Sequence, residues 1–323
     1  MEYINNNHDS YLMHTIKQPS KILIGKNSIP EFNFPKKSLL ITSPGAKKRG
    51  SISYLNFQPD LIFEEVEPNP SMETVEKIIK KFQNSDFSTI IGLGGGSVLD
   101  VAKFTGYKLN KTKILIPTNF GSGSEVTRIS VLKINGIKQS FHDDKLIADV
   151  AIVDSNFVKQ TDFAILKNSA IDACAQCTEG FDSKLGNMYT RFLCNTAFEI
   201  LEKAILEKKY ENLALGSLIS GLGFGNCSTT LGHSLSYVFS NEGYSHGHAL
   251  AYTTQFAHKF NLSIYAERFE KIVKQLDFDK IYLKQNLDDA SKLILTDHRH
   301  LNNNPKHVSK NDIIEILETI NSL

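Results

Sequence analysis

The stretch Thr89-Ile-Ile-Gly-Leu-Gly-Gly-Gly-Ser-Val-Leu-Asp-Val-Ala-Lys103 joins an apolar run to three consecutive glycines and then to a helix-like segment. Thr89–Leu93 has the length and composition of a buried strand. A helix predicted from Val98 directs unpaired N–H groups and its positive dipole end toward the glycines. Because glycine has no Cβ to obstruct an anion, the stretch predicts a phosphate site. It matches neither G-x-G-x-x-G nor the P-loop, and a simple tight turn is the alternative interpretation.

Apolar runs of similar length precede and follow this stretch. Between them lie amphipathic segments such as Glu73–Phe82, where apolar residues recur at helical spacing. Strands that alternate with helices predict a parallel sheet with crossover helices. Continuous apolar runs fit strands that are covered on both faces. We therefore predict a Rossmann-like α/β domain over residues 1–160. Its other strands are predicted at Lys21–Gly25, Ser38–Thr42, Leu61–Val66, Lys113–Ile116 and Val150–Val153.

The pattern changes after about Ala164, where strand-like runs stop and helical spacing continues. This change predicts a second, all-helical domain over residues 161–323. Ser309 is the predicted N-cap of the last helix, and the polar stretch Asp297–His307 predicts a surface loop. The helices are predicted at Ser169–Phe181, Tyr189–Glu207, Glu211–Phe224, Ser228–Phe239, His248–Lys259 and Asn311–Ile320.

The length and composition limit the classes of protein to which the chain can belong. With 323 residues and 41% hydrophobic content, the chain is long enough for two domains with real cores. A net charge of +1 argues against nucleic-acid or membrane-surface binding through overall charge. Met1–Ser20 lacks the features of a secretory signal, and no apolar run reaches the roughly 20 residues of a membrane span. We expect a cytoplasmic protein. Its four cysteines indicate no disulfide framework, and Cys174 and Cys177 are interpreted as core residues.

A second cluster of small and hydroxyl-bearing residues follows the next strand. It reads Pro117-Thr-Asn-Phe-Gly-Ser-Gly-Ser-Glu-Val-Thr127. Ligands of open α/β sheets bind at the carboxyl ends of the strands. Both clusters stand at such ends, so we expect them to face one crevice.

Four segments together resemble one family. Gly94–Lys103 resembles the GGGSxxDxAK signature of the iron-containing alcohol dehydrogenases, and Pro117–Thr127 their PTTxGTGSEVT segment. Glu67–Pro70 resembles their PNP loop, and Asn302–Lys306 their C-terminal end. The resemblance covers nearly the whole chain, which is shorter than is usual around residues 200–215 and 260–290. It implies the family's architecture, also described as dehydroquinate synthase-like, and a homodimer.

The resemblance implies that NADPH or NADH lies on the two loops. The pyrophosphate would lie on the glycines, the adenosine beside Asn69 and the nicotinamide end near Asp100. Lys138 matches the spacing of a lysine that contacts the cofactor. The implied cofactor residues are Ser43, Asn69, Gly94, Gly95, Gly96, Ser97, Asp100, Thr118, Ser122, Ser124 and Lys138.

Ser43 bears on the choice of cofactor. It stands where members of the family that prefer NAD often carry an aspartate for the ribose hydroxyls. Without that carboxylate a 2′-phosphate is not repelled, and Lys47, Lys48 and Arg49 attract it. The sequence therefore favours NADPH, with NADH as the alternative.

The resemblance also implies a divalent metal, Fe²⁺ or Zn²⁺. The family binds it through an aspartate, a histidine four residues later on the same helix face, and two further histidines. Asp172, His233 and His246 match, whereas Gln176 replaces the first histidine and offers a weaker neutral oxygen. We predict Asp172, Gln176, His233 and His246 as ligands. The alternatives are a metal-free reductase, as in maleylacetate reductases, and a nucleotide-binding relative without catalysis.

The predicted reaction is hydride transfer between the nicotinamide and a small aldehyde or alcohol. Tyr237 or His248 is the predicted proton relay. Gln176 and the segments Thr229–Tyr237 and His246–Ala249 resemble the phosphonoacetaldehyde reductase branch, which forms 2-hydroxyethylphosphonate. Succinic semialdehyde, malonic semialdehyde and lactaldehyde are alternative substrates. The candidate residues for a substrate anion are Arg128, His142 and Lys145.

Overall fold

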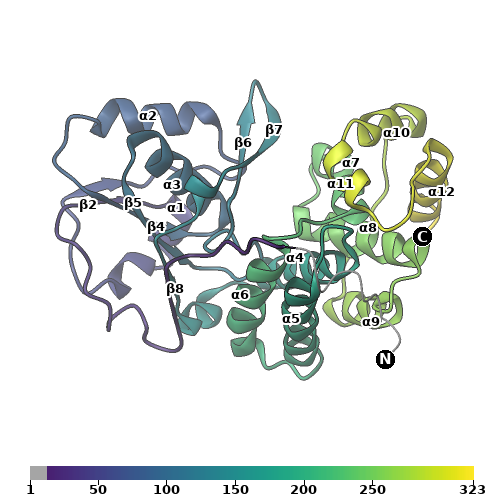
Figure 1. Cartoon of the computed structure of the whole chain (residues 1–323), viewed down its shortest axis with the longest axis horizontal. Coiled ribbons are helices and arrows are strands. Elements are labelled where there is room, and N and C mark those ends of the chain that lie inside the picture. The colour runs from purple at the N-terminus through teal and green to yellow at the C-terminus, as the bar shows by residue number, and fades with distance from the viewer. Residues whose placement is uncertain (1–12) are drawn as a thin grey trace.

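The computed structural model describes residues 13–323 and contains a six-stranded sheet in its N-terminal half (Figure 1). The strand order is β1-β8-β5-β4-β2-β3, and all the pairings are parallel. This confirms the predicted α/β fold and every predicted strand. The strands are β1 (Lys21–Ile24), β2 (Ser38–Ile41), β3 (Leu61–Phe63), β4 (Thr89–Gly94), β5 (Thr112–Pro117) and β8 (Val150–Val153).

The two central strands place the two loops side by side. In the register of β4 with β5, Gly94 pairs with Pro117, so both strands end at one level. Every residue of β4 is buried, as expected for a strand covered on both faces. The helices of this half are α1 (Pro44–Lys48), α2 (Met72–Phe82) and α3 (Gly96–Leu109), with 3₁₀ turns at Ser51–Tyr54, Asp144–Leu146 and Ser155–Gln160.

An antiparallel hairpin, which the sequence did not predict, follows the second loop. Its strands are β6 (Ile129–Ile134) and β7 (Ile137–His142), joined at Asn135 and Gly136, both with positive φ. Asn-Gly with these angles is a preferred two-residue hairpin turn. The polar strand β7 lacks the apolar alternation of a half-buried strand, which explains the omission. In Figure 1 the hairpin projects beside the gap that separates the sheet from the last helices.

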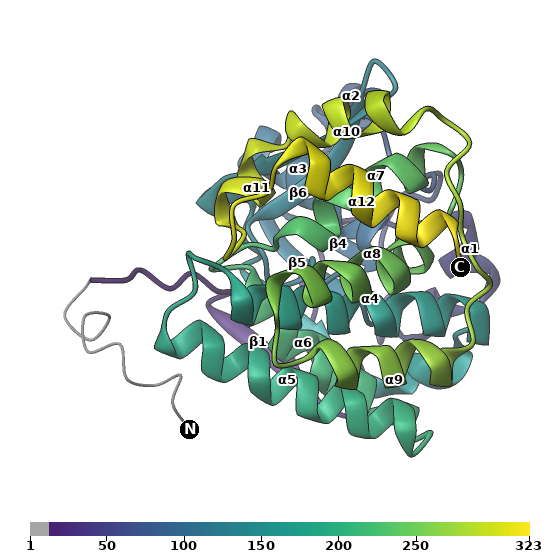
Figure 2. The same ribbon diagram turned by 90° about the vertical axis from the view of Figure 1, so that its right-hand side faces the viewer.

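The second half, from residue 163 onward, is helical (Figure 2). All the predicted helices are present, and Ser309 caps the last one in a capping box with Asp312. Two helices between residues 266 and 295 were not predicted. The helices are α4 (Phe163–Asp182), α5 (Met188–Leu206), α6 (Leu213–Phe224), α7 (Leu231–Asn241), α8 (His246–Asn261), α9 (Ala266–Leu276), α10 (Leu287–Leu295), α11 (His298–Asn303) and α12 (Lys310–Asn321), with a 3₁₀ turn at Tyr210–Asn212.

The prediction of a surface loop at Asp297–His307 is wrong, because most of this stretch forms α11. Asp297 accepts a hydrogen bond from the backbone N–H of His300 and so caps the short helix. Asn303 and Asn304 are buried, and the Asn303 side chain donates to the carbonyl oxygens of Cys227 and Thr229. A polar sequence thus folds inward because its amides bond to buried backbone. Within residues 13–323, none of the helices is long and apolar enough to cross a membrane.

Candidate active site

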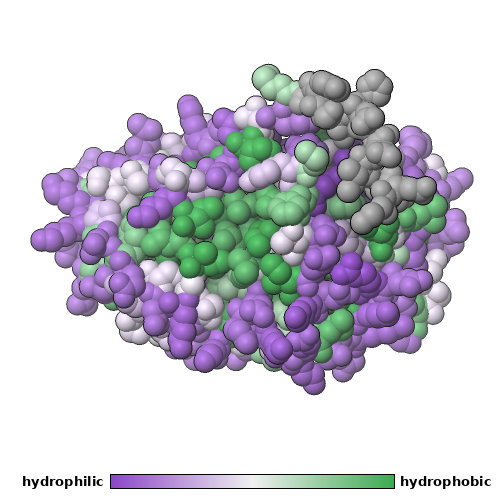
Figure 3. Space-filling view, turned by 60° about the horizontal axis from the view of Figure 1, so that its bottom comes forward, coloured by the Kyte–Doolittle hydropathy of each residue, from purple (hydrophilic) through white to green (hydrophobic). Residues whose placement is uncertain are grey.

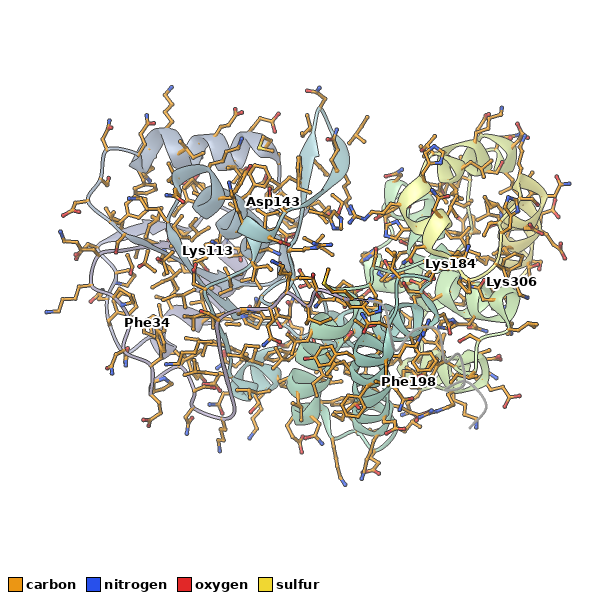
Figure 4. All side chains as sticks on the ribbon, viewed as in Figure 1. Phe34, Lys113, Asp143, Lys184, Phe198 and Lys306 are labelled. Carbon is orange, nitrogen blue, oxygen red and sulfur yellow. The ribbon has the colours of Figure 1, made fainter. Side chains whose placement is uncertain are left out.

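A cleft of about 240 Å³ lies where the two halves of the molecule meet. The N-terminal half contributes the loops after β4 and β5 and the hairpin, and the helical half contributes α4, α7, α8 and α11. Figure 4 shows side chains from both halves directed into the region between the hairpin and the last helices. The predicted residues that line the cleft are Asn69, Gly96, Ser97, Asp100, Ser122, Ser124, Lys138, His142, Asp172, Gln176, His233, Tyr237 and His246.

The glycines fit closely against the second loop. Gly94 ends β4, Gly95 is the N-cap of α3, and Gly96 is the first residue of that helix. A Cβ on Gly95 would lie 2.8 Å from the Asn119 side chain, and one on Gly96 would lie 2.8 Å from Oγ of Ser122. The absent side chains therefore allow the loops to pack together and leave the helix N-terminus open to the cleft. This is the geometry that binds a phosphate.

Asp100 connects α3 to the second loop and the hairpin. Its carboxylate accepts a hydrogen bond from Oγ of Ser124 at 2.6 Å and another from the backbone N–H of Val131 at 3.1 Å. Nζ of Lys103, which is fully buried, lies 3.3 Å from the same carboxylate and donates to the carbonyl oxygen of Ile129. These contacts explain the Asp and Lys of the signature, because they fix the walls of the cleft.

Asp172, His233 and His246 converge at the other end of the cleft. Oδ1 of Asp172 lies 3.9 Å from Nε2 of His233 and 3.8 Å from Nε2 of His246. One ligand atom from each residue lies within 4.8 Å of the others. Zn²⁺ sits about 2.0–2.2 Å from nitrogen and oxygen ligands, so one ion fits between them after a small adjustment. Burial raises the pKa of Asp172 to about 6, and burial together with the neighbouring His233 lowers the pKa of His246.

Gln176 completes the same group. Its Nε2 donates to Oδ1 of Asp172 at 2.9 Å, whereas its buried Oε1 has no hydrogen-bond partner among the described residues. A buried acceptor without a partner is costly, and a cation would satisfy it. Two imidazoles, a carboxylate and this free amide oxygen suit Fe²⁺ or Zn²⁺. The residues present therefore fit the metal that the resemblance implies.

Glu179, which the sequence analysis missed, orients His233. Its carboxylate accepts hydrogen bonds from Oγ1 of Thr230 at 2.9 Å and from the backbone N–H of Gly232 at 2.5 Å, and it contacts Nδ1 of His233. Although burial opposes its ionisation, the contacts with His233 hold the pKa of Glu179 below its usual value. A carboxylate on Nδ1 leaves Nε2 free for a metal. The available signal was a carboxylate seven residues after Asp172, on one face of an apolar helix.

His300 also lines the cleft, although it belongs to the stretch predicted as a loop. Its Nδ1 lies 2.7 Å from Oδ2 of Asp297. Its ring stacks on that of His233 at 6.2 Å between centroids, and the Tyr237 ring lies 5.9 Å away. Nothing in a short polar segment indicated this position, because it depends on the packing of α11 against α7.

The structure does not place the remaining predicted residues on the cleft. Ser43 caps α1 through a hydrogen bond from the Ala46 N–H, and the buried Thr118 hydroxyl has no hydrogen-bond partner within residues 13–323. Arg128 pairs with Asp144 at 3.1 Å. His248 stacks on Phe278 and contacts the carbonyl oxygen of Asp279, and it does not line the cleft. Three other predicted residues do not line the cleft: Gly94, Gly95 and Lys145.

The chain was compared with known families. Residues 19–155 match the model of the iron-containing alcohol dehydrogenases, and residues 167–296 match the model of the C-terminal part of the Fe-containing alcohol dehydrogenase family. The chain belongs to the iron-containing alcohol dehydrogenase family. Both matched ranges contain residues of the cleft, so the family relationship covers the loops and the predicted metal ligands alike.

The chain is similar to relatives that are named as alcohol and hydroxybutyrate dehydrogenases. It is 31% identical to a 4-hydroxybutyrate dehydrogenase of Clostridium kluyveri over 209 residues, 56% of each chain, so the match spans little more than half of that relative. It is 29% identical to an NADPH-dependent butanol dehydrogenase of Clostridium saccharobutylicum over 302 residues, which is 80% of this chain and 76% of that one.

A solved structure confirms the fold. The sulfoacetaldehyde reductase from Bifidobacterium kashiwanohense in complex with NAD⁺ superimposes with a TM-score of 0.84 at 21% identity. The superposition covers 96% of this chain and 99% of that one. At this identity the similarity concerns architecture, so the cofactor and substrate of that enzyme are its own.

Proposed function

We propose that this protein reduces a small aldehyde to a primary alcohol with NADPH or NADH and a divalent metal. The observation that carries the proposal is the shared cleft, in which the glycine loop stands at one end and Asp172, His233 and His246 converge at the other. Hydride transfer requires the nicotinamide and the substrate oxygen to meet in such a space.

The side chains have distinct roles in this proposal. Gly96, Ser97 and Ser122 bind the pyrophosphate, and Asp172, Gln176, His233 and His246 hold Fe²⁺ or Zn²⁺. When bound, the cation acts as a Lewis acid on the substrate oxygen, and the nicotinamide supplies the hydride.

A proton must also reach the substrate oxygen. Burial raises the pKa of the Tyr237 phenol, so its hydroxyl keeps the proton, and the side chain lines the cleft, where this hydroxyl can donate to a substrate oxygen. We assign the relay to Tyr237 alone, because His248 faces the segment after α9.

Phosphonoacetaldehyde is the proposed substrate, and 2-hydroxyethylphosphonate the product. Support comes from the resemblance of Gln176 and its neighbours to that branch, and from the basic residues on the hairpin side of the cleft, such as Lys133 and Lys138. The relative named 4-hydroxybutyrate dehydrogenase favours succinic semialdehyde as the second candidate. Both aldehydes carry an anionic group.

The proposed cofactor is NADPH. The position after β2 holds Ser43, whose neutral hydroxyl is used as a helix cap, so no carboxylate repels a 2′-phosphate there. Lys48 and Arg49 stand at the end of the short helix α1 that follows. Lys47 is less available, because its Nζ pairs with Glu64 at 2.6 Å.

A homodimer is part of the proposal. Figure 3 shows a continuous hydrophobic area, bordered by hydrophilic side chains, on the face turned forward. Exposed apolar patches of this kind commonly mark interfaces between proteins. Exposed apolar side chains of the helical half include Phe163, Met188, Phe192, Leu206 and Leu215.

The test of the proposed function is NADPH and NADH oxidation by purified protein with phosphonoacetaldehyde, succinic semialdehyde, lactaldehyde and propionaldehyde. We expect turnover of phosphonoacetaldehyde that is lost on chelation and restored by Fe²⁺ or Zn²⁺. Turnover of another aldehyde alone would contradict the substrate, and turnover that survives chelation would contradict the metal. Cofactor binding without turnover of any aldehyde would contradict the enzymatic function.

Substituting Gln176→His tests the altered ligand set. Because imidazole is a better ligand than an amide oxygen for Fe²⁺ or Zn²⁺, we expect tighter metal binding, by about tenfold or more. The measurement is competition with a chelator of known affinity, followed by metal analysis. Unchanged affinity would mean that residue 176 does not contact the ion. Gln160→His, outside the cleft, is the control and should leave the metal affinity as it is.

A further inference from the structure

One face of the β6–β7 hairpin is turned toward the cleft. Residues that alternate along a strand share a face of the sheet, and so do partners that lie opposite each other on paired strands. The partners on this face are Lys133 with Lys138, Val131 with Ser140, and Ile129 with His142. All six of these residues line the cleft. The hairpin therefore forms one wall of the cleft, and the two lysines stand on that wall next to the turn.

Contacts on the other face and at the backbone fix the position of this wall. Leu132, on the opposite face, is fully buried, and the Phe141 ring meets that of Phe104 edge to face at 4.9 Å between centroids. The backbone N–H of Lys133 donates to the carbonyl oxygen of Pro70 at 2.8 Å. Pro70 itself lines the cleft. Lys133 is thus anchored beside the cleft through its own backbone, which leaves its partly exposed side chain free to contact a ligand.

Lys133 and Lys138 are like charges placed directly opposite each other. The Cβ atoms of such partners lie about 4.5–5.5 Å apart, and like charges in these positions destabilise a sheet. Burial and the charge of Lys133 both lower the pKa of Lys138, as expected for neighbouring cations. Neither Nζ has a hydrogen bond or an ion pair within 4 Å to any of residues 13–323. The repulsion between the two lysines is therefore not relieved by a carboxylate of the described chain.

The carboxylates that line the cleft have other partners. Those of Asp100 and Asp172 are the acidic groups among the lining residues. Asp100 accepts a hydrogen bond from Ser124 and lies 3.3 Å from Nζ of Lys103. Asp172 accepts a hydrogen bond from Gln176. The two hairpin lysines are therefore available for the negative charge of a bound ligand.

We propose that Lys133 and Lys138 form a clamp for a doubly charged phosphoryl ligand, in which Lys133 supplies a contact that the sequence did not predict. A terminal phosphoryl group carries about two negative charges and three acceptor oxygens, and each ammonium group has three donors. Both lysines can thus bind one ligand through different oxygens. A sulfonate or a carboxylate has a single charge and balances only one of them. The clamp therefore selects phosphonates and phosphates over the other anions.

Two ligands of the proposed reaction carry phosphoryl charges. One is the phosphonate of the proposed aldehyde. The other is the cofactor, which has a pyrophosphate and, in NADPH, a 2′-phosphate as well. The choice of these two ligands rests on the proposed function. The clamp itself rests on the charges and positions of the two lysines, so it can be tested by binding alone.

Calorimetric titration with ethylphosphonate and ethanesulfonate, at mildly alkaline pH, tests the clamp without turnover. The two head groups each have three oxygens but differ by one charge, so we expect the unaltered protein to bind ethylphosphonate more tightly. Lys133→Met keeps the apolar stem and removes the charge, and it should weaken ethylphosphonate binding roughly tenfold and ethanesulfonate binding less. Lys133→Arg keeps a charged donor and should retain most of the affinity. Lys80→Met, on the exposed face of α2 and outside the cleft, is the control.

Titrations with ADP-ribose, NADH and NADPH identify the source of the phosphoryl group. If Lys133→Met weakens all three alike, the clamp binds the pyrophosphate, and if it weakens NADPH alone, the clamp binds the 2′-phosphate. If the three affinities are unchanged, the clamp binds the substrate, and the ratio of kcat/KM for phosphonoacetaldehyde to that for propionaldehyde should fall roughly tenfold.

The clamp is overturned if Lys133→Met and Lys80→Met behave alike with every one of these ligands and aldehydes. It is also overturned if Lys133→Met weakens ethylphosphonate and ethanesulfonate binding equally, because the second charge is then not recognised. Absence of turnover with every aldehyde would contradict the proposed function, whereas weaker binding of ethylphosphonate or ADP-ribose to Lys133→Met would still support the clamp.

Discussion

Replacing Asp172 with asparagine is expected to abolish metal retention and to lower aldehyde reduction on the order of 10³-fold, since Lewis-acid stabilisation contributes several kcal/mol and each 1.36 kcal/mol is tenfold in rate. Asp172 has the only carboxylate in the cluster of ligand-type side chains found among the described residues. The amide keeps the shape but removes the negative charge that faces His233, His246 and Gln176. The measurement combines metal analysis after dialysis with steady-state turnover.

The matched control is Asp182→Asn, at the end of the same helix. Asp182 has a nearly buried carboxylate whose Oδ2 lies 3.5 Å from Nδ1 of His258, outside the cleft. Like Asp172→Asn, this variant loses a buried charge from α4. It therefore measures how far the loss of such a charge alone lowers the stability of the protein. It should retain its metal. Metal retention and turnover in Asp172→Asn comparable to those of the unaltered protein would contradict the assignment of the ligands. Cofactor binding by both variants would show that the N-terminal half remains folded.

The sequence predicted those parts of the site whose positions follow from local structure. The glycine triplet between β4 and α3 needs only one strand, one turn and one helix, and the register of β4 with β5 then brings Ser122 and Ser124 to the same edge. Asp172 and Gln176 are likewise neighbours on one helix face. The convergence of His233 and His246 with them came from the family resemblance, because no local pattern relates α4 to α7 and α8.

The missed parts depend on packing between distant segments. The carboxylate of Glu179 meets Nδ1 of His233, and this contact exists only because α4 and α7 lie together. His300 reaches the cleft because α11 packs on α7, and its polar neighbours gave no periodic signal. His248 illustrates the opposite error. Its proximity in sequence to His246 suggested a role in proton transfer, yet it is two residues further along α8, and its ring faces Phe278.

The buried pair of Lys103 and Asp100 shows how the signature supports the site. The side chain of Lys103 is fully buried, with 0% of its surface exposed. Its charge is balanced by the carboxylate of Asp100, which is 13% exposed. Burial lowers the pKa of Lys103, whereas Asp100 opposes that effect. Replacing Lys103 with methionine removes the cation and leaves the Asp100 carboxylate without it. We expect the free energy of unfolding to fall by about 3–5 kcal/mol, the usual cost of removing one partner of a buried pair.

Urea denaturation of Lys103→Met and of Lys103→Met/Asp100→Asn measures this cost. The double variant should recover part of the loss, because it leaves no charge buried without its counter-ion. Lys37→Met, which removes a lysine from the exposed pair with Asp86, should cost at most about 1 kcal/mol. A Lys103→Met protein as stable as Lys37→Met would show that the pair does not stabilise the fold. Lys103 bonds to Ile129, and Asp100 bonds to Ser124 and Val131. These contacts hold the hairpin and the second loop, which form one wall of the cleft. The loss of stability should therefore appear together with weaker cofactor binding.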